Sequence, residues 1–97
     1  MNMVDIEFEW DLRKDAANVT KHGCSFVEAE ETFEDPAGLM LSDDGHSRVE
    51  QRLYWVGASN AGRILTTRFT LRESKVRIIG CAEWRKFRRM YEAAKIK

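Results

Sequence analysis

The sequence has 97 residues, of which 43% are hydrophobic and 33% charged, and its 16 basic and 16 acidic residues give a formal net charge of zero. This composition is typical of one globular domain spanning residues 1–97 and excludes a disordered or low-complexity chain. No apolar run approaches the roughly 18 residues that cross a bilayer. The N-terminus carries acids where a signal peptide would carry lysines, so we expect a cytoplasmic protein with no membrane partner.

Charge is divided unevenly along the chain. Residues 1–50 hold thirteen acids and four bases, whereas residues 51–97 hold twelve bases and three acids. Such an asymmetry indicates a polyanion or an oppositely charged partner, although the two halves could instead neutralise each other across the fold. Nine of the twelve bases lie between Arg63 and Arg89, a density that would create a local positive field.

The N-terminal part is predicted to form one strand and two short helices. Residues 4–10 alternate between apolar and acidic side chains, which is typical of an edge strand. Asp11 can cap a helix over residues 12–21, and Gly23 can end it in a left-handed conformation. A serine followed three residues later by a glutamate predicts a second helix that runs to about Phe33.

The rest of the chain is predicted to form strands and a final helix. The strands are expected at residues 39–41, 51–57, 63–71 and 75–81, and the helix at residues 83–96. The apolar stripe of that helix consists of Trp84, Phe87, Tyr91 and Ala94. The order β-α-α-β-β-β-β-α predicts an α+β fold, an antiparallel sheet (meander) with two short N-terminal helices and one C-terminal helix packed on it.

Several classes of enzyme lose support because their motifs are missing. The sequence contains no phosphate-binding loop, dinucleotide fingerprint, nucleophile elbow or HExxH motif. Its histidines and cysteines lack the spacing of a zinc site, so we expect neither a metal nor another cofactor. Cys24 and Cys81 are expected to be buried free thiols.

Polar residues of the strand region could carry chemistry. Glu50 and Arg52 are two apart on a predicted strand and therefore project to the same face, with His46 in the loop before them. The following strands and their turn add Arg68, Arg72 and Arg77. A carboxylate that exchanges protons and guanidinium groups that stabilise charge on phosphate are what a metal-free ribonuclease needs. The same Glu50–Arg52 pattern is also typical of a structural salt bridge.

A series of short motifs runs from about Phe8 to Tyr91. It consists of Phe8-Glu-Trp-Asp11, Asn18, Lys21-His-Gly23, Ser25-Phe26, Glu28-Ala29, Phe33-Glu-Asp-Pro36, Asp43, His46-Ser47, Glu50-x-Arg52, Gly57, Gly62-Arg63, Thr70-x-Arg72 and Arg77-Ile-Ile79. Each motif is weak by itself. Their order and spacing across nearly the whole chain resemble those of the BrnT family of bacterial toxins.

The resemblance implies the toxin of a type II toxin–antitoxin pair. Such a toxin is a small, metal-independent endoribonuclease with a fold similar to the RelE toxins, and it inhibits translation by cleaving RNA. The implied partner is a BrnA-like ribbon-helix-helix antitoxin, and operator DNA would be bound only through the antitoxin complex. The basic half of the chain would face RNA, and an acidic antitoxin segment could cover it.

The resemblance also assigns site residues. The candidate catalytic residues are Glu50, Arg52, Arg72 and Arg77. The candidate RNA-binding residues are Lys21, His22, His46, Arg68, Arg85 and Arg88.

The sequence departs from the family pattern after its last predicted strand. The family typically continues Ile-Ile-Ser-Ala-Arg, whereas here Ile79 is followed by Gly80-Cys81-Ala82-Glu83. A cation expected near the scissile phosphate is therefore missing, and Arg85 or Arg88 would have to replace it. One alternative is a catalytically weak or inactive module of the same fold that acts as a protein-interaction or co-repressor subunit. A DNA-binding domain acting alone is a further alternative, but the chain lacks a helix-turn-helix pattern.

Overall fold

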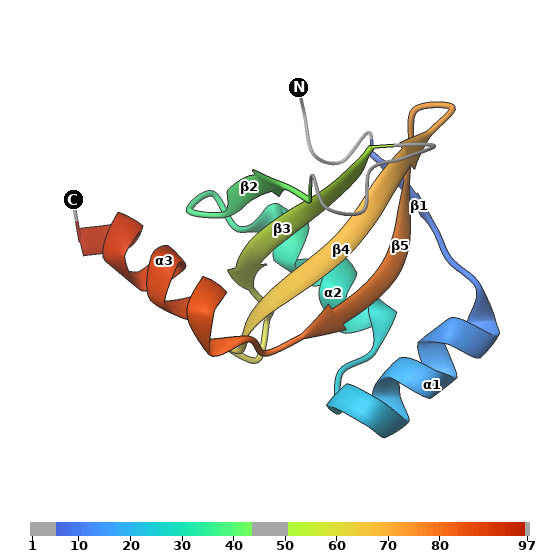
Figure 1. The fold of residues 1–97 in the computed structure, drawn as a ribbon, viewed down its shortest axis with the longest axis horizontal. Helices are drawn as coiled ribbons and strands as arrows, with labels where there is room; N and C mark the ends of the chain where they lie inside the picture. Colours follow the sequence, from blue (N-terminus) through green and yellow to red (C-terminus); the bar gives the residue numbers. More distant parts are fainter. Residues whose placement is uncertain (1–5, 44–50, 97) are drawn as a thin grey trace.

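The structure is a computed structural model that describes residues 6–43 and 51–96. Its elements are β1 (Glu7–Glu9), α1 (Leu12–His22), α2 (Phe26–Glu31), a 3₁₀ turn (Thr32–Glu34), β2 (Leu39–Ser42), β3 (Arg52–Ala58), β4 (Ile64–Arg72), β5 (Lys75–Ala82) and α3 (Arg85–Ile96). The strands form one sheet in the order β1-β5-β4-β3-β2 (Figure 1). The predicted α+β class and element order are confirmed.

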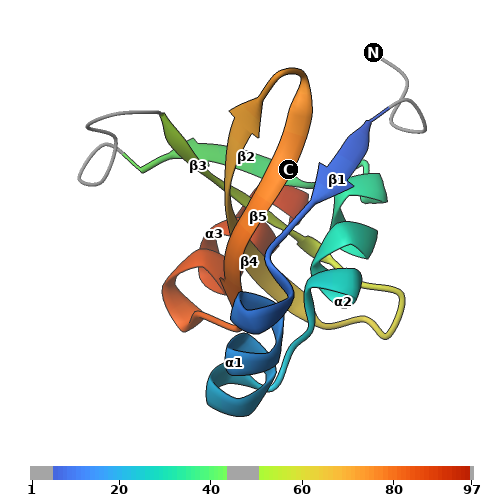
Figure 2. The ribbon, with the colours of Figure 1, turned by 90° about the vertical axis from the view of Figure 1, so that its right-hand side faces the viewer.

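The sheet is mixed, whereas the sequence predicted only its antiparallel meander. Strands β2 to β5 form the predicted antiparallel meander, but β1 pairs in parallel with β5, with Glu7 opposite Lys75 and Glu9 opposite Arg77. After β1 the chain crosses one face of the sheet through α1 and α2 to the far edge, and it returns through β2, β3 and β4 to reach β5 beside β1 (Figure 2). Parallel pairing requires a crossover of this kind. Similarity to the RelE toxins stays a prediction.

The N-terminal helices begin and end as their local signals predict. The Asp11 carboxylate accepts hydrogen bonds from two amide groups in the first turn of α1, and Gly23 ends that helix with φ of 73°. The Ser25 hydroxyl accepts a hydrogen bond from the Glu28 amide at the start of α2. The Glu28 carboxylate binds the Arg63 guanidinium at 2.9 Å, so it links α2 to the strands.

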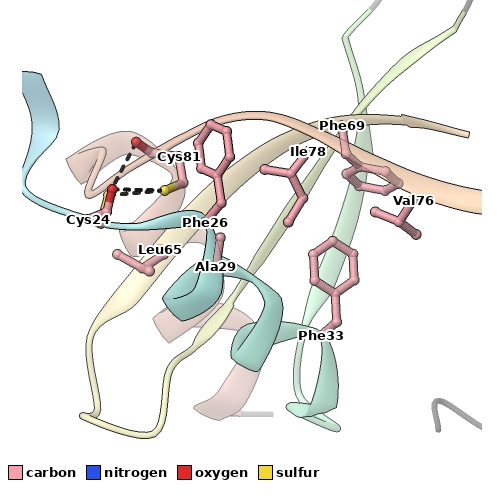
Figure 3. Packing of buried hydrophobic residues seen from close by; sticks show 9 residues of the cluster. All are labelled: Cys24, Phe26, Ala29, Phe33, Leu65, Phe69, Val76, Ile78 and Cys81. Carbon is pink, nitrogen blue, oxygen red and sulfur yellow. Dashed lines mark hydrogen bonds between the residues drawn. The ribbon is translucent and has the colours of Figure 1, made fainter. Parts of the chain in front are cut away.

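The face of the sheet that α1 and α2 cover carries the apolar core. The buried cluster consists of Cys24, Phe26, Ala29, Phe33, Leu65, Phe69, Val76, Ile78 and Cys81 (Figure 3). Phe33 lies at its centre, with ring centroids 5.1 Å from Phe8, 5.4 Å from Trp55 and 5.3 Å from Phe69. Alternate residues of β4 face this core, although Leu71 at the strand's end is exposed.

Asn18 connects α1 to the end of β5. Its Nδ2 donates hydrogen bonds to the carbonyl oxygens of Cys24 and Cys81, both at 2.9 Å, and its Oδ1 accepts one from the Cys81 amide at 3.1 Å. The two thiols are buried and free, as predicted, with their Sγ atoms 3.2 Å apart. Their mutual hydrogen bond lowers the pKa of Cys24 and raises the pKa of Cys81. Asn18 thus satisfies backbone groups that water does not reach.

Helix α3 packs against the opposite face of the sheet (Figure 2). Trp84, just before it, and Phe87 contact the ring of Tyr54, with centroids 6.0 and 5.1 Å apart. Tyr91 is buried and donates its hydroxyl to the Asp35 carboxylate. Ala94 was predicted to belong to the same buried stripe, but it is exposed because the last turn of α3 extends away from the sheet (Figure 1).

Replacing Asn18 with alanine should lower the free energy of unfolding by about 2–4 kcal/mol, because two carbonyl groups and one amide lose their buried partner. Denaturant unfolding of the wild type and the variant would measure the difference. Val19→Ala on the same helix is the control, since Val19 is 46% exposed and should cost only about 0.5 kcal/mol. Equal losses in the two variants would contradict the role assigned to Asn18.

Burial and the hydrogen bond to Asp35 raise the pKa of Tyr91 from 10.0 to about 12. Because the folded state holds this proton more tightly than the unfolded chain, the associated stability is complete below about pH 10 and is lost as the pH rises through about 12. The expected loss is about 2–3 kcal/mol. The test compares the unfolding free energies of the wild type and Tyr91→Phe near pH 9 and pH 12. The wild type should lose its advantage at the higher pH, whereas a constant difference would refute the assignment.

Candidate functional site

Arginines gather on the face of the sheet opposite α1 and α2. The strand register places Arg52 of β3, Thr70 of β4 and Arg77 of β5 side by side. Arg68 and Arg72 lie two positions on either side of Thr70 along β4, so they project to the same face. Thr70 therefore has an arginine at each of its four nearest positions on this face. We call these the arginine cluster: Arg52, Arg68, Arg72 and Arg77.

The spacing of the arginine cluster suits binding of one anion by several side chains. Neighbours across a strand pair have Cβ atoms about 4.5–5.5 Å apart, and residues two apart along a strand are about 6.6–6.8 Å apart. Arginine side chains are long enough for two or three guanidinium groups to converge over such distances, and each can form paired hydrogen bonds to phosphate. The cluster can therefore stabilise negative charge that develops at one position.

Among the described residues, Glu9 and Asp43 contact the arginine cluster. Glu9 lies 3.3 Å from the Arg77 guanidinium, and both side chains are about 30% exposed, at 33% and 28%. An exposed pair of this kind contributes about 1 kcal/mol or less, so a phosphate could replace Glu9 at little cost. Asp43 is buried, and its carboxylate lies 3.5 Å from Arg68. The acidic and basic halves of the chain thus neutralise each other in part, which is one of the two interpretations that the sequence left open.

Thr70 occupies the centre of the arginine cluster. It is 1% exposed, and its hydroxyl has no hydrogen-bond partner among the residues that the structure describes. A buried hydroxyl without a partner costs stability, and Thr67 on the core face of β4 has an unpaired hydroxyl too. The register of three strands shows that Thr70 lies between Arg52 and Arg77, which the sequence alone does not reveal.

A pocket of about 420 Å³ lies beside the arginine cluster. Helix α1, strands β4 and β5 and the residue before α3 contribute to its wall. Its lining includes Lys14, Ala17, Lys21, His22, Arg68 and Trp84. The structure therefore brings the predicted residues Lys21, His22 and Arg68 together, and Arg68 belongs to both the cluster and the pocket.

Two residues of the pocket were missed from the sequence. No motif singled out Lys14, although it precedes Lys21 by seven residues and so lies on the same side of the helix. Trp84 was assigned to the apolar stripe of the last helix by its spacing. That assignment is correct, since Trp84 packs on Tyr54, but Trp84 also lines the pocket.

The segment where an arginine was expected has a structural role. Gly80 pairs with Arg68 and lines the pocket, and an added Cβ there would lie 3.5 Å from Asn18 Oδ1. Glu83 forms an ion pair with Arg63 at 2.7 Å. Within the described part of the chain, neither Arg85 nor Arg88 lines the pocket, and Arg88 pairs with Glu92 of its own helix at 3.3 Å. Replacement of the missing cation by either residue stays a prediction.

Two predicted site residues, His46 and Glu50, lie outside the described residues, and their roles stay predictions. Within residues 6–43 and 51–96, no His, Cys, Asp and Glu side chains gather in a group that could hold a metal ion. Over the same ranges, no helix is long and apolar enough to cross a membrane.

Comparisons with known proteins identify a family. A family model described as "Ribonuclease toxin, BrnT, of type II toxin-antitoxin system" matches residues 10–87. The crystal structure of the Brucella abortus ribonuclease toxin, BrnT, aligns with a TM-score of 0.62 and 21% sequence identity, covering 81% of this chain and 96% of that chain. At this identity the structural match shows a shared fold. A search of curated proteins found no match.

Proposed function

The chain belongs to the BrnT family of ribonuclease toxins of type II toxin–antitoxin systems, and we propose that it is a cytoplasmic, metal-independent endoribonuclease that inhibits translation by cleaving RNA. The arginine cluster is the observation that supports this proposal. It places four guanidinium groups around one position of the sheet. That is the electrostatic arrangement a phosphoryl-transfer transition state needs when no metal ion is used.

The proposed cleavage uses the ribose 2′-hydroxyl as nucleophile. A base takes the 2′-OH proton, the 2′ oxygen attacks phosphorus, and an acid protonates the 5′ oxygen as the P–O5′ bond breaks. The products are a 2′,3′-cyclic phosphate and a 5′-hydroxyl. We assign charge stabilisation to Arg52, Arg72 and Arg77. Glu50 is the carboxylate proposed to exchange protons, because its spacing from Arg52 predicts the same strand face.

The residues proposed to bind RNA surround the arginine cluster. Lys21 and His22 lie at the end of α1 and line the pocket that Arg68 shares with the cluster. Their positions support an RNA path that runs from the cluster towards α1. Arg85, Arg88 and His46 are further candidates from the sequence, and we propose that they extend this RNA path.

An antitoxin partner is implied by the family. We propose a BrnA-like ribbon-helix-helix antitoxin that covers the arginine cluster with an acidic segment, so that operator DNA is bound only by the complex. Arg72 is exposed and Arg77 is partly exposed, which leaves both within reach of a protein partner. Complementary charge on the two surfaces would favour fast and specific association.

A second candidate function is a binding module of the same fold without catalysis. The Gly80–Glu83 segment favours it, because it lacks the arginine that the family resemblance implies and its acid is held by Arg63. In this case the arginine cluster would bind the antitoxin alone.

Replacing Arg77 with glutamine should slow RNA cleavage about 10²–10³-fold, because one cation is removed from the transition state. The purified protein would be assayed on bulk RNA in EDTA, with the chemistry of the product ends and growth after induced expression followed in parallel. Arg89→Gln, an exposed residue of α3, is the matched control and should retain activity. Loss of wild-type cleavage in EDTA would refute metal independence. A folded wild type that cleaves no RNA would favour the binding module.

The double charge reversal Arg72→Glu with Arg77→Glu should weaken both RNA cleavage and antitoxin binding, since both partners are proposed to contact the same cations. Affinity for a co-purified ribbon-helix-helix antitoxin can be measured by calorimetry, with Lys86→Glu together with Arg89→Glu, two exposed residues of α3, as the control. Unchanged antitoxin affinity in the cluster variant would show that the antitoxin binds elsewhere.

A further inference from the structure

We propose that the pocket between α1, β5 and the start of α3 binds one unpaired nucleotide of the RNA, next to the nucleotide that is cleaved. Its base would lie against Trp84, and its phosphate would lie among Lys14, Lys21 and Arg68. The inference rests on the proposed function, because it takes the arginine cluster as the position of cleavage.

One side of the pocket is cationic. Lys14 and Lys21 come from α1 and Arg68 comes from β4, and no acid is among the described residues that line the pocket. Asp43 contacts Arg68 at 3.5 Å but does not line it. A concave surface lined by cations attracts polyanions, so we expect a phosphate group to bind on this side of the pocket.

The other side of the pocket is apolar. Ile79 of β5 and Trp84 line the pocket there, whereas Ala17 lies between Lys14 and Lys21 on the α1 side. The indole of Trp84 is held by Tyr54, with an interplanar angle of 89°, and by Phe87, with ring centroids 5.9 Å apart. An aromatic ring fixed in this way can stack a base without first losing conformational freedom. Stacking of this kind strengthens binding roughly 5- to 150-fold per base.

The pocket is continuous with the arginine cluster. Arg68 lines it, and Thr70 follows two positions later on the same face of β4, about 6.6–6.8 Å away. Gly80 lies opposite Arg68 and has no side chain to fill the space in front of Asn18. The volume of about 420 Å³ lies within the range of pockets that hold small ligands. A base can enter such a pocket only when it is unstacked, so the ligand is single-stranded RNA.

Two neighbouring alanines of α1 provide a matched test. Ala17 lines the pocket, whereas Ala16 lies outside its lining, and both are exposed on the helix. Binding of a fully 2′-O-methylated RNA of about ten nucleotides, which has no 2′-hydroxyl to react, would be measured by fluorescence anisotropy. Ala17→Glu should bind about 10-fold more weakly than the wild type, because it places an acid at the phosphate position. Ala16→Glu adds the same charge and should change affinity less than about 2-fold.

The contribution of the base would be tested at Trp84. Trp84→Ala should weaken binding of the same oligonucleotide roughly 5-fold or more, and Trp84→Phe should restore most of the affinity because phenylalanine still stacks. Thermal melting of each variant shows whether it folds. If Trp84→Ala does not fold, the Ala17→Glu and Ala16→Glu pair still tests the pocket.

The outcomes separate this inference from the proposed function. If the wild type cleaves RNA but Ala17→Glu and Ala16→Glu bind the oligonucleotide equally well, nucleotide binding in the pocket is refuted and the ribonuclease activity stands. If the wild type binds RNA with the expected variant effects but does not cleave it, the ribonuclease activity is refuted and nucleotide binding in the pocket stands. A wild type that neither binds nor cleaves would overturn both. Equal affinities of Trp84→Ala and Trp84→Phe would overturn stacking of the base.

Discussion

The buried amide of Asn18 is the contact on which the candidate site depends. It joins the α1–α2 junction to the end of β5 through three hydrogen bonds to backbone groups. Helix α1 carries Lys14, Lys21 and His22, so this contact fixes where these side chains lie relative to Arg68 of β4. The positions of these side chains are therefore set by buried hydrogen bonds at the base of the pocket.

Strand β4 serves stability and chemistry at once. Leu65 and Phe69 face α2 and belong to the core, whereas Arg68 and Thr70 face the opposite side. Because side chains alternate along a strand, the same nine residues hold the core and carry the cations. Packing on one face keeps β4 and its neighbours in register, and that register determines which arginines stand beside Thr70 on the other face.

Local sequence signals predicted the helices and strands. The features that were not predicted depend on contacts between residues that are far apart in the sequence. Capping at Asp11 and the glycine at the end of α1 depend on a few adjacent residues, so both could be predicted. The pairing of β1 with β5 could not be predicted, because the alternation of apolar and acidic residues indicates a strand but does not identify its partner strand. The neighbours of Thr70 depend on two pairings, one of which includes an irregularity at Arg68/Phe69. Helical spacing identified the apolar role of Trp84, but not its place in the wall of the pocket.

The parallel pairing of β1 with β5 has a consequence for synthesis of the chain. Glu9 meets Arg77 across 68 positions, and Asn18 meets Cys81 across 63. Chains emerge from the ribosome N-terminus first, and contacts between distant positions form late in folding. Helix α1 therefore has no anchor on the sheet until β5 has been made and has left the ribosome. A nascent chain that stops before Lys75 contains Lys14, Lys21 and Arg68 but has no strand to hold them together.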